Sequence, residues 1–287
     1  MIRTNSFYPS GCFKVASFNL RTDSRGDKFN RWEYRKQLAI EAIRRTGASV
    51  IGVQEALPAM REDLQRMLKG YSVFGWGRSK NKQSEHSDII IRNEDANVEF
   101  HKTIWLSKHP EIPGSRAYFA VFPRICTVAE VHFKGMEDRR VRVFNTHFDH
   151  VCGLARRLGV EIILRYIHEY NKTDPLPTII MGDFNAKRSS KCVRMLRENT
   201  HGYSDLRFVD VYSYFDKHHE EPMNTYHGFK GKLGKSPIDY IFVTDDFTVE
   251  NVKIDTSMID GRYPSDHYPV IATLSLKKKQ KDIQKSA

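Results

Sequence analysis

The chain has 287 residues, of which 40% are hydrophobic and 28% are charged. This balance excludes a disordered chain and a membrane-embedded one, while the length fits one large domain or two small ones. Lys and Arg total 46 against 35 Asp and Glu, which gives a net charge of +11. A field of this sign attracts polyanions such as nucleic acids or phosphorylated metabolites, although basic side chains equally serve solubility.

The first third of the chain alternates strand and helix patterns. The run KVASFNL, from Lys14 to Leu20, alternates like a half-buried strand, and a polar loop follows it to Asn30. Apolar spacing predicts a helix over residues 31–45, and the apolar run SVIGVQ predicts a strand that stops at Glu55. A second helix is expected after Pro58. A strand, a helix and a strand in this order indicate an α/β sandwich whose sheet is covered by helices.

The rest of the chain supplies further strands and one long helix. Strand-like runs occur at 71–74, 88–91, 125–132, 141–146, 178–182, 238–243, 249–254 and 270–276. An amphipathic helix is predicted from Leu154 to Tyr170. No linker, low-complexity block or short repeat interrupts the chain, so we expect one domain containing two packed sheets. We assign residues 1–13 to an N-terminal extension, 14–276 to the folded domain and 277–287 to a basic, solvated tail.

The cysteines and the apolar runs bear on the compartment. Four widely spaced cysteines form neither a CxxC pair nor a zinc pattern, which predicts free thiols in a reducing compartment. The segment from Met1 to Lys14 lacks the apolar run of a signal peptide, and no segment approaches the roughly 20 apolar residues that span a bilayer. We therefore expect a cytoplasmic protein without a membrane anchor.

Several predicted strands end in residues that can bind a metal or a phosphate. They are Asn19 in SFNL, Glu55 in VQE, His147 in NTHFDH, Asp183 and Asn185 in GDFN, and Asp266 with His267 in SDHYP. Strand ends form the rim where ligands bind in layered α/β proteins. The pattern therefore favours one shared site over scattered surface groups.

These residue types suit the hydrolysis of a phosphoester. The reaction requires charge neutralisation on the phosphoryl oxygens, an oriented water molecule and a stabilised leaving oxygen. Oxygen ligands such as Asn19, Glu55 and Asp266 suit Mg²⁺ or Mn²⁺ better than Zn²⁺. Asp183 can orient or deprotonate the water, and the amide of Asn185 is an uncharged donor. Histidines can donate to phosphoryl oxygens, and a neighbouring carboxylate fixes their tautomer.

The ordered motifs FNLR, VQE, NTHFDH, GDFNA, IDYIFV and SDHYPV resemble the endonuclease/exonuclease/phosphatase superfamily, from about Lys14 to Leu276. Each motif is weak alone, but their common order makes coincidence improbable. WLSKHPEIPGS, PRICT, TYHGF and GRYPSDHYP resemble its compact microbial branch, close to the deadenylase-like group. The resemblance implies that residues 14–276 are a catalytic domain with a deoxyribonuclease I-like fold. This fold is a four-layer α/β sandwich of two packed mixed β-sheets flanked by helices.

The same resemblance implies roles for the residues at the strand ends. Asn19, Glu55 and Asp266 would bind Mg²⁺ or Mn²⁺ as the cofactor. Asp183 and Asn185 would act on the nucleophilic water and the transition state.

The two histidines would bind the scissile phosphate, each backed by a carboxylate. The matching positions are Glu85 in SEHSD behind His147, and Asp239 in SPIDYIF behind His267. The branch usually has a glycine before the first of these acids, whereas this chain has Ser84. The chain therefore departs from the family pattern next to Glu85, the residue expected to pair with His147.

Three further residues are expected to contact the substrate. Arg124 in FPRIC either clamps a phosphate or pairs with a surface carboxylate. His150 and His227 are assigned to the site by motif resemblance alone. Residues of these types also have structural explanations when taken singly, because buried histidines occur in cores and a carboxylate such as Glu55 can cap a helix.

We carry three hypotheses about function. The first is a metal-dependent nuclease, a phosphodiesterase resembling 3′-to-5′ exonucleases of RNA or single strands, with nucleic acid as its substrate. The alternative is a phosphomonoesterase that acts on a sugar phosphate or another small phosphorylated metabolite. The third is an inactive scaffold that binds polyanions. A monomer without membrane contact is assumed in each case.

Overall fold

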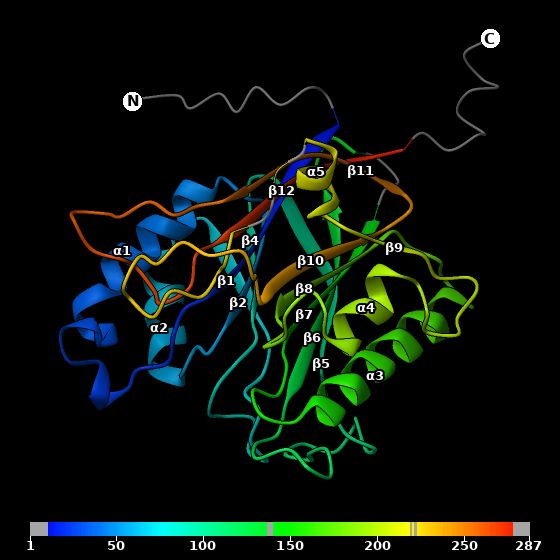
Figure 1. Ribbon diagram of the computed structural model, residues 1–287, viewed down its shortest axis with the longest axis horizontal. Helices are drawn as coiled ribbons and strands as arrows, with labels where there is room; N and C mark the ends of the chain where they lie inside the picture. The colour runs from blue at the N-terminus through cyan, green and yellow to red at the C-terminus, as the bar shows by residue number, and fades with distance from the viewer. Residues whose placement is uncertain (1–10, 137–139, 219, 221–222, 278–287) are drawn as a thin grey trace.

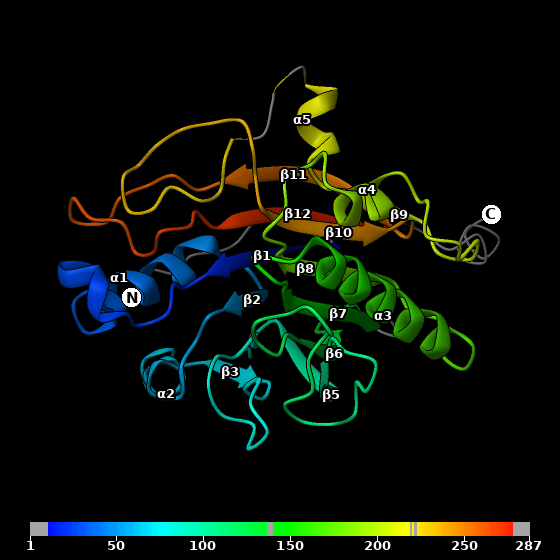
Figure 2. The ribbon, with the colours of Figure 1, turned by 60° about the horizontal axis from the view of Figure 1, so that its bottom comes forward.

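The computed structural model describes residues 11–136, 140–218, 220 and 223–277. Most of the expected N-terminal extension, residues 1–10, and the basic tail from residue 278 lie outside the described residues. Two six-stranded sheets pack face to face, and helices lie on their outer faces (Figure 1, Figure 2). The expected α/β sandwich with two packed mixed sheets is therefore confirmed.

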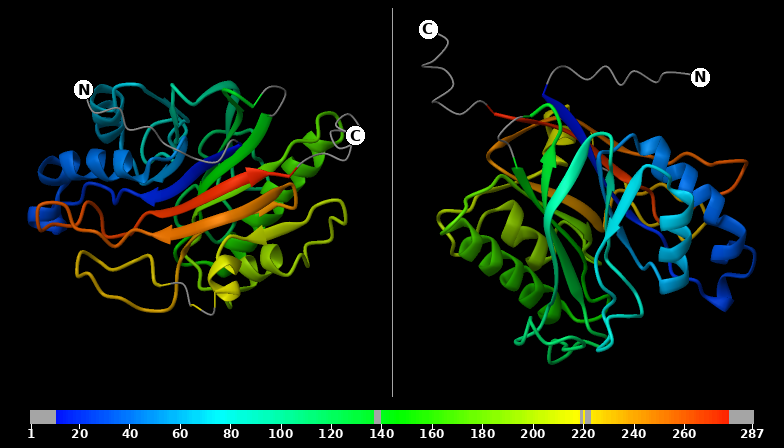
Figure 3. Two further views of the ribbon diagram at one scale, coloured as in Figure 1. Left: turned by 90° about the horizontal axis from the view of Figure 1, so that it is seen from above. Right: turned by 180° about the vertical axis from the view of Figure 1, so that it is seen from behind.

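The first sheet has the strand order β11-β12-β1-β2-β4-β3. Its members are β1 (Cys12–Asn19), β2 (Val50–Gln54), β3 (Tyr71–Phe74), β4 (Ile89–Arg92), β11 (Phe247–Ile254) and β12 (Val270–Leu276). The pair β1 and β2 is parallel, and the other neighbours are antiparallel. The left view of Figure 3 shows β1 in blue beside β12 in red and β11 in orange.

The second sheet has the strand order β5-β6-β7-β8-β10-β9. Its members are β5 (Ala96–Trp105), β6 (Ile125–Phe133), β7 (Arg140–His147), β8 (Thr178–Asp183), β9 (Phe208–Asp210) and β10 (Asp239–Thr244). Here β7 and β8 form the parallel pair within an otherwise antiparallel sheet. Each sheet thus has one parallel pair near its centre.

Helices cover the outer face of each sheet (Figure 1). Helices α1 (Trp32–Thr46) and α2 (Pro58–Met67) pack on the first sheet, through a cluster that contains Leu38, Leu64 and Ile51. Helices α3 (Gly153–Asn171) and α4 (Lys191–Arg197) pack on the second, and α5 (Ser213–Lys217) lies near β11. A short 3-10 helix, η1, spans Arg25–Asn30. The larger core cluster fills the space between the sheets and beneath α3 and α4.

A buried polar bridge joins the two sheets between β2 and β7. Gln54 Nε2 donates to Asn145 Oδ1 at 2.7 Å, and Asn145 Nδ2 donates to the carbonyl oxygens of Val53 and Asp88 at 2.9 and 2.8 Å. A Cβ atom on Gly52 would lie 2.6 Å from Asn145 Oδ1, so only glycine lets the side chain approach so closely. This bridge fixes the relative position of the sheets just above the strand ends.

The strand registers bring the polar ends together. Asn19 at the end of β1 pairs with Gln54, and His147 at the end of β7 pairs with Asp183. Strand β10 runs the other way and begins at Asp239, directly opposite Asp183. Because the sheets are packed face to face, these ends meet at one edge of the sandwich.

The sequence predicted most of these elements but not all of them. Strands β5 and β9, helices α4 and α5 and the short helix η1 were not predicted, the last because a polar loop was expected there. All four cysteines are free, as expected. In the described part of the chain, no helix combines the length and the apolar character needed to cross a bilayer.

Candidate active site

A pocket of about 440 Å³ opens at the edge where the strand ends meet. The expected site residues in its lining are Glu55, Glu85, Arg124, His147, His150, Asp183, Asn185, Asp266 and His267. Asn19 and Asp239 are fully buried and support this lining from behind. The structure therefore collects eleven of the twelve expected residues in one place, with His227 as the exception.

Asn19 links the two sheets at the floor of the pocket. Its Nδ2 atom donates to Glu55 Oε1 of the first sheet and to Asp183 Oδ2 of the second, at 2.9 Å in both cases. The second oxygen of Glu55 accepts the backbone N–H of Thr22 at 2.8 Å. The NH₂ group of Asn19 thus bridges two carboxylates. Negative charge from both sheets converges at this point.

Residues just past the strand ends adopt left-handed backbone conformations. Glu55 has φ 63° and Asn185 has φ 48°, which lie in a backbone region that residues other than glycine rarely adopt. Such backbone strain clusters at functional sites, where surrounding contacts hold it. In this case it turns both side chains back into the pocket.

The GDFN turn positions Asp183 and Asn185 together. The Asn185 backbone N–H donates to Asp183 Oδ1 at 2.8 Å. The Asn185 amide nitrogen donates to the carbonyl oxygen of Phe148 at 3.1 Å and to His147 Nε2 at 2.9 Å. Burial, together with the nearby Asp239, raises the pKa of Asp183 to about 7.

His267 is held as a charged donor by carboxylates. Its Nδ1 lies 2.9 Å from Asp239 Oδ2, and its Nε2 lies 3.8 Å from Asp183 Oδ2. Burial by itself lowers the pKa of His267, but Asp239, Asp183 and Asp266 together raise it to about 10. The expected pairing of His267 with Asp239 is therefore present in the structure.

His147 lies in the opposite electrostatic environment. Burial, followed by the positive charges of Arg124 and Arg78, holds its pKa well below the usual range. Because Asn185 donates to His147 Nε2, the neutral imidazole carries its proton on Nδ1.

The expected pairing of Glu85 with His147 was wrong. Glu85 Oε1 instead accepts from Arg78 Nη2 at 2.9 Å, and no hydrogen bond joins Glu85 to His147 among the described residues. Ser84, at the position where the branch has glycine, adopts φ 70°, so the serine keeps the left-handed conformation. Glu85 pairs with Arg78 because a guanidinium forms a stronger, charge-assisted hydrogen bond to a carboxylate than a neutral imidazole does.

Two nearly buried arginines form one wall of the pocket. Arg78 and Arg124 are 9% and 6% exposed, and Arg78 lies 4.6 Å from the ring centroid of Phe122. Arg124 Nη2 lies 2.9 Å from His150 Nδ1, and its Nε lies 3.9 Å from a buried carboxylate oxygen of Asp149. Burial, with the repulsion from Arg78, lowers the pKa of Arg124. This wall therefore presents positive charge to the pocket.

Sequence reasoning missed six lining residues, which are Arg21, Thr22, Arg78, Phe122, Tyr226 and Ile238. Arg78 lies in the polar stretch GWGRSKNK and reads there as a solvated cation, and Phe122 and Tyr226 read as ordinary apolar residues. Only their position beside Arg124 or His267 gives them a role in the pocket. The one signal that could have led to Arg78 is that Glu85, an acid assigned to the site, needs a positively charged partner.

His227 does not line the pocket, contrary to expectation. It stacks on Tyr268 with ring centroids 3.9 Å apart, and burial lowers its pKa to about 4. Its neighbour Tyr226 lines the pocket instead and meets the His267 ring edge-on at 5.1 Å. The TYHGF motif thus contributes its tyrosine rather than its histidine.

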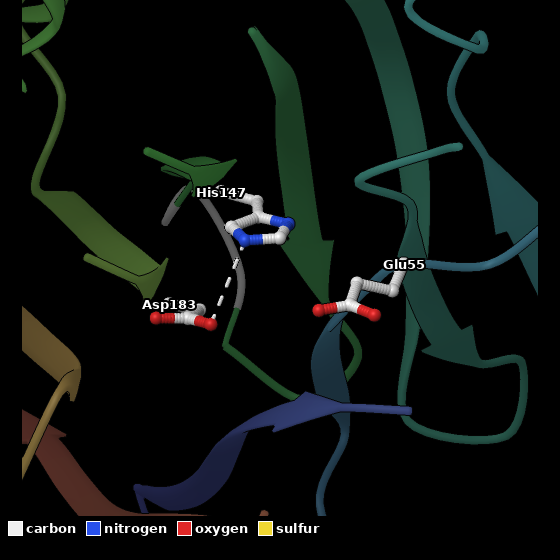
Figure 4. Close-up of side chains that lie close together, drawn as sticks. All are labelled: Glu55, His147 and Asp183. Carbon is white, nitrogen blue, oxygen red and sulfur yellow. Dashed lines mark ion pairs between the residues drawn. The ribbon is translucent and has the colours of Figure 1, made fainter. Parts of the chain in front are cut away.

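Two overlapping groups of side chains can hold a metal ion. In one, ligand atoms of Glu55, His147 and Asp183 lie within 4.8 Å of one another (Figure 4). In the other, Asp183 joins Asp239 and His267. Asp266 belongs to neither group, although it lines the same pocket, 3.7 Å from Arg21 Nε.

Comparisons with known proteins place this geometry in a wider context. Residues 16–267 match the model of the Endonuclease/Exonuclease/phosphatase family. A structure of a family protein from Bacteroides thetaiotaomicron is 27% identical, with a TM-score of 0.83, over 93% of this chain and 95% of that one. A mannosyl-6-phosphatase from the same species is 28% identical, with a TM-score of 0.82, over 92% of this chain and 100% of that one.

A more distant structure shares the fold alone. The human Nocturnin catalytic domain with a bound sulfate anion is 17% identical, with a TM-score of 0.71, over 93% of this chain and 95% of that one. No curated protein matches the chain.

Proposed function

The chain belongs to the endonuclease/exonuclease/phosphatase family and is a phosphoester hydrolase, and on this basis we propose that it is a Mg²⁺- or Mn²⁺-dependent phosphomonoesterase. Its substrate is a sugar phosphate or a similar small phosphorylated metabolite. This reverses the order in which the sequence placed the nuclease and the phosphatase.

One observation carries this choice. The wall formed by Arg78 and Arg124 stands beside His147 in a pocket of about 440 Å³, within the roughly 300–1,000 Å³ typical of small-molecule sites. Two guanidiniums beside the reacting group suit a terminal phosphate, which carries more charge than the phosphodiester of a nucleic acid. The similarity to a mannosyl-6-phosphatase over 92% of this chain supports the same choice.

The floor of the pocket fits a hard divalent cation. Glu55 and Asp183 supply oxygen ligands of the kind that Mg²⁺ and Mn²⁺ prefer, and the Asn19 amide nitrogen between the two carboxylates marks a place suited to positive charge. Asn19 would offer its side-chain oxygen to the cation after its amide turns over, because that oxygen otherwise accepts the backbone N–H of Arg21. Asp266 would complete this set from the first sheet. When bound, the cation neutralises charge on the phosphoryl oxygens and on the leaving oxygen.

Asp183 and Asn185 act on the attacking water. The Asn185 backbone N–H holds Asp183 Oδ1, which fixes the carboxylate so that its other oxygen faces the pocket. Asp183 accepts the proton of the water, and the Asn185 N–H that His147 Nε2 stops accepting when His147 becomes charged donates to the phosphoryl group.

The histidines and arginines hold the phosphate. His267, kept protonated by Asp239, donates from Nε2 to a phosphoryl oxygen. An anion bound beside Arg78 and Arg124 offsets their repulsion of the His147 imidazolium, so the pKa of His147 rises when substrate enters. Phosphate binding and the charging of His147 are therefore coupled.

A substrate panel tests the proposal. Hexose phosphates, inositol phosphates, single-stranded RNA and DNA and an abasic duplex would be incubated with the enzyme, with Mg²⁺ and with Mn²⁺. We expect phosphate release from a monoester, with the apparent KM raised at least about tenfold in Arg124→Ala. Cleavage of RNA or DNA without monoester hydrolysis would reject the phosphomonoesterase.

That second outcome would support the nuclease, which one observation favours. The net charge of +11 produces a field that attracts nucleic acid. The nuclease hypothesis predicts that Arg124→Ala weakens oligonucleotide cleavage with a marked dependence on salt, as expected for phosphodiester contacts.

A further inference from the structure

A second hollow lies outside the catalytic pocket. It measures about 920 Å³ and is formed by α3, by α4 with the preceding Ser189, and by residues 200–203. None of its lining residues lines the catalytic pocket. We call it the α3–α4 hollow, and Figure 1 shows these helices on the right side of the molecule.

Cations dominate the rim of the α3–α4 hollow. Arg157 and Arg165 come from α3, Lys191 and Arg194 come from α4, and Glu161 is the one acid in the lining. Glu161 lies 3.7 Å from Arg157. Arg165 and Lys191 are exposed and form no ion pair with any described residue. The rim therefore has positive charge in excess.

The interior of the α3–α4 hollow is apolar and aromatic. Ile162 and Met195 are buried in its floor, and Leu158 is half-buried beside them. The ring of Tyr203 and the imidazole of His201 add aromatic surface to the wall, with ring centroids 6.3 Å apart. A cationic rim over an apolar, aromatic floor suits a ligand with an anionic end and a flat organic body.

The wall also holds an unused hydrogen-bond donor. His201 Nδ1 accepts the backbone N–H of Tyr203 at 3.4 Å, so the neutral imidazole carries its proton on Nε2. His201 Nε2 is buried and has no hydrogen-bond partner among the described residues. An unpaired buried donor is unfavourable, and a ligand oxygen would satisfy it once the ring turns toward the hollow.

We propose that the α3–α4 hollow is a second ligand site that binds a nucleoside phosphate. The phosphate contacts Arg165 and Lys191, and the base lies against Tyr203 and the apolar floor. A bounded hollow with an apolar floor fits a single nucleotide better than a nucleic-acid strand, which needs a continuous basic track. The proposal does not depend on which phosphoester the catalytic pocket hydrolyses.

Calorimetric titration of the full chain with AMP, in buffer containing EDTA to suppress hydrolysis, tests this site. Adenosine, ribose 5-phosphate and inorganic phosphate serve as probes that lack the phosphate, the base or both organic parts. We expect AMP to bind at least about tenfold more tightly than each of them. Equal affinities, or no AMP binding, would overturn the proposal.

Variants locate the binding. The double variant Arg165→Ala/Lys191→Ala removes two exposed cations and should weaken AMP binding at least about tenfold, with an unchanged melting temperature because both residues are exposed. The matched double variant Arg45→Ala/Lys69→Ala removes the same charge near α1 and α2 and should bind AMP normally. Retained binding in the first variant, or loss of binding in Arg124→Ala, would assign AMP to another site.

Discussion

Asn19 connects the two halves of the molecule through one side chain. Its side-chain nitrogen donates to Glu55 of the first sheet and to Asp183 of the second, and its side-chain oxygen Oδ1 accepts the backbone N–H of Arg21 at 2.9 Å. Asparagine suits this place because it is short, uncharged and able to donate and accept at once. A cation ligand set assembled in this way depends on both sheets.

Glu55→Gln should raise the metal concentration needed for half-maximal activity on the order of tenfold, because carboxylate charge sets the affinity of such sites. Activity would be titrated with Mg²⁺ and with Mn²⁺. Glu62→Gln is the matched control, since Glu62 is exposed on α2. An unchanged metal requirement would remove Glu55 from the proposed ligand set.

Asn185→Ala should lower kcat by about 10²–10³, the usual cost of losing one donor to the transition state. Initial rates at saturating substrate, on folded protein, measure this effect. His227→Gln should keep near-normal kcat, because His227 lies outside the pocket lining. A large loss in the His227 variant would restore the role that the motif suggested.

The sequence anticipated the residues at strand ends better than their partners. Strand-end polar groups stand out against apolar runs, which is why Asn19, Asp183 and His267 were found. Hydrogen-bond partners are brought close only by folding, so the sequence did not show that Glu85 pairs with Arg78. His227 was misplaced because a motif gives no direction for its side chains.

Among the elements, the central parallel pairs position the site. Strands β1 and β2, and β7 and β8, end at the same edge because parallel neighbours share their carboxyl ends. The alternation of KVASFNL made β1 predictable, and continuous apolar runs made β2 and β8 predictable. Strand β5 was missed because its first half is largely exposed, and β9 and α5 were missed because they are too short to show periodicity.

The bridge between β2 and β7 should be important for stability. Asn145→Ala removes the hydrogen bonds that Asn145 makes to Gln54 Nε2 and to two carbonyl oxygens and opens a small cavity, so the free energy of unfolding should fall by about 2–4 kcal/mol. Urea denaturation measures this loss. Asn97→Ala, at an exposed position of β5, should change stability by less than about 0.5 kcal/mol. A similar, small change in both variants would refute the bridge.

Strand β9 carries a buried acid with a predictable pH effect. Burial raises the pKa of Asp210 to about 6 from the ordinary 3.8. The folded state therefore holds the proton more tightly, so this contribution to stability is present below about pH 4 and is lost as pH rises through 6. At pH 7.5 this loss is on the order of 3 kcal/mol.

Asp210→Asn should remove this pH dependence. Relative to wild type, the variant should gain stability between pH 5 and pH 7.5, as measured by urea unfolding at both values. A constant difference between the two proteins at both pH values would contradict the raised pKa of Asp210.

At the scale of the whole molecule, two sheets of similar plan face each other and neither contains a complete site. Glu55 and Asn19 belong to one sheet, and His147 and Asp183 belong to the other. The sequence revealed this architecture through the order of its motifs. It did not reveal the substrate, because the arginine wall comes from Arg78 and Arg124 on separate segments of irregular chain.

Crystals grown with Mn²⁺ and inorganic phosphate test the convergence of these residues most directly. The anomalous signal should show manganese between the carboxylates of Glu55 and Asp183, with phosphate held by His147, His267 and Asn185. Manganese bound elsewhere, or phosphate seated away from both histidines, would contradict the account.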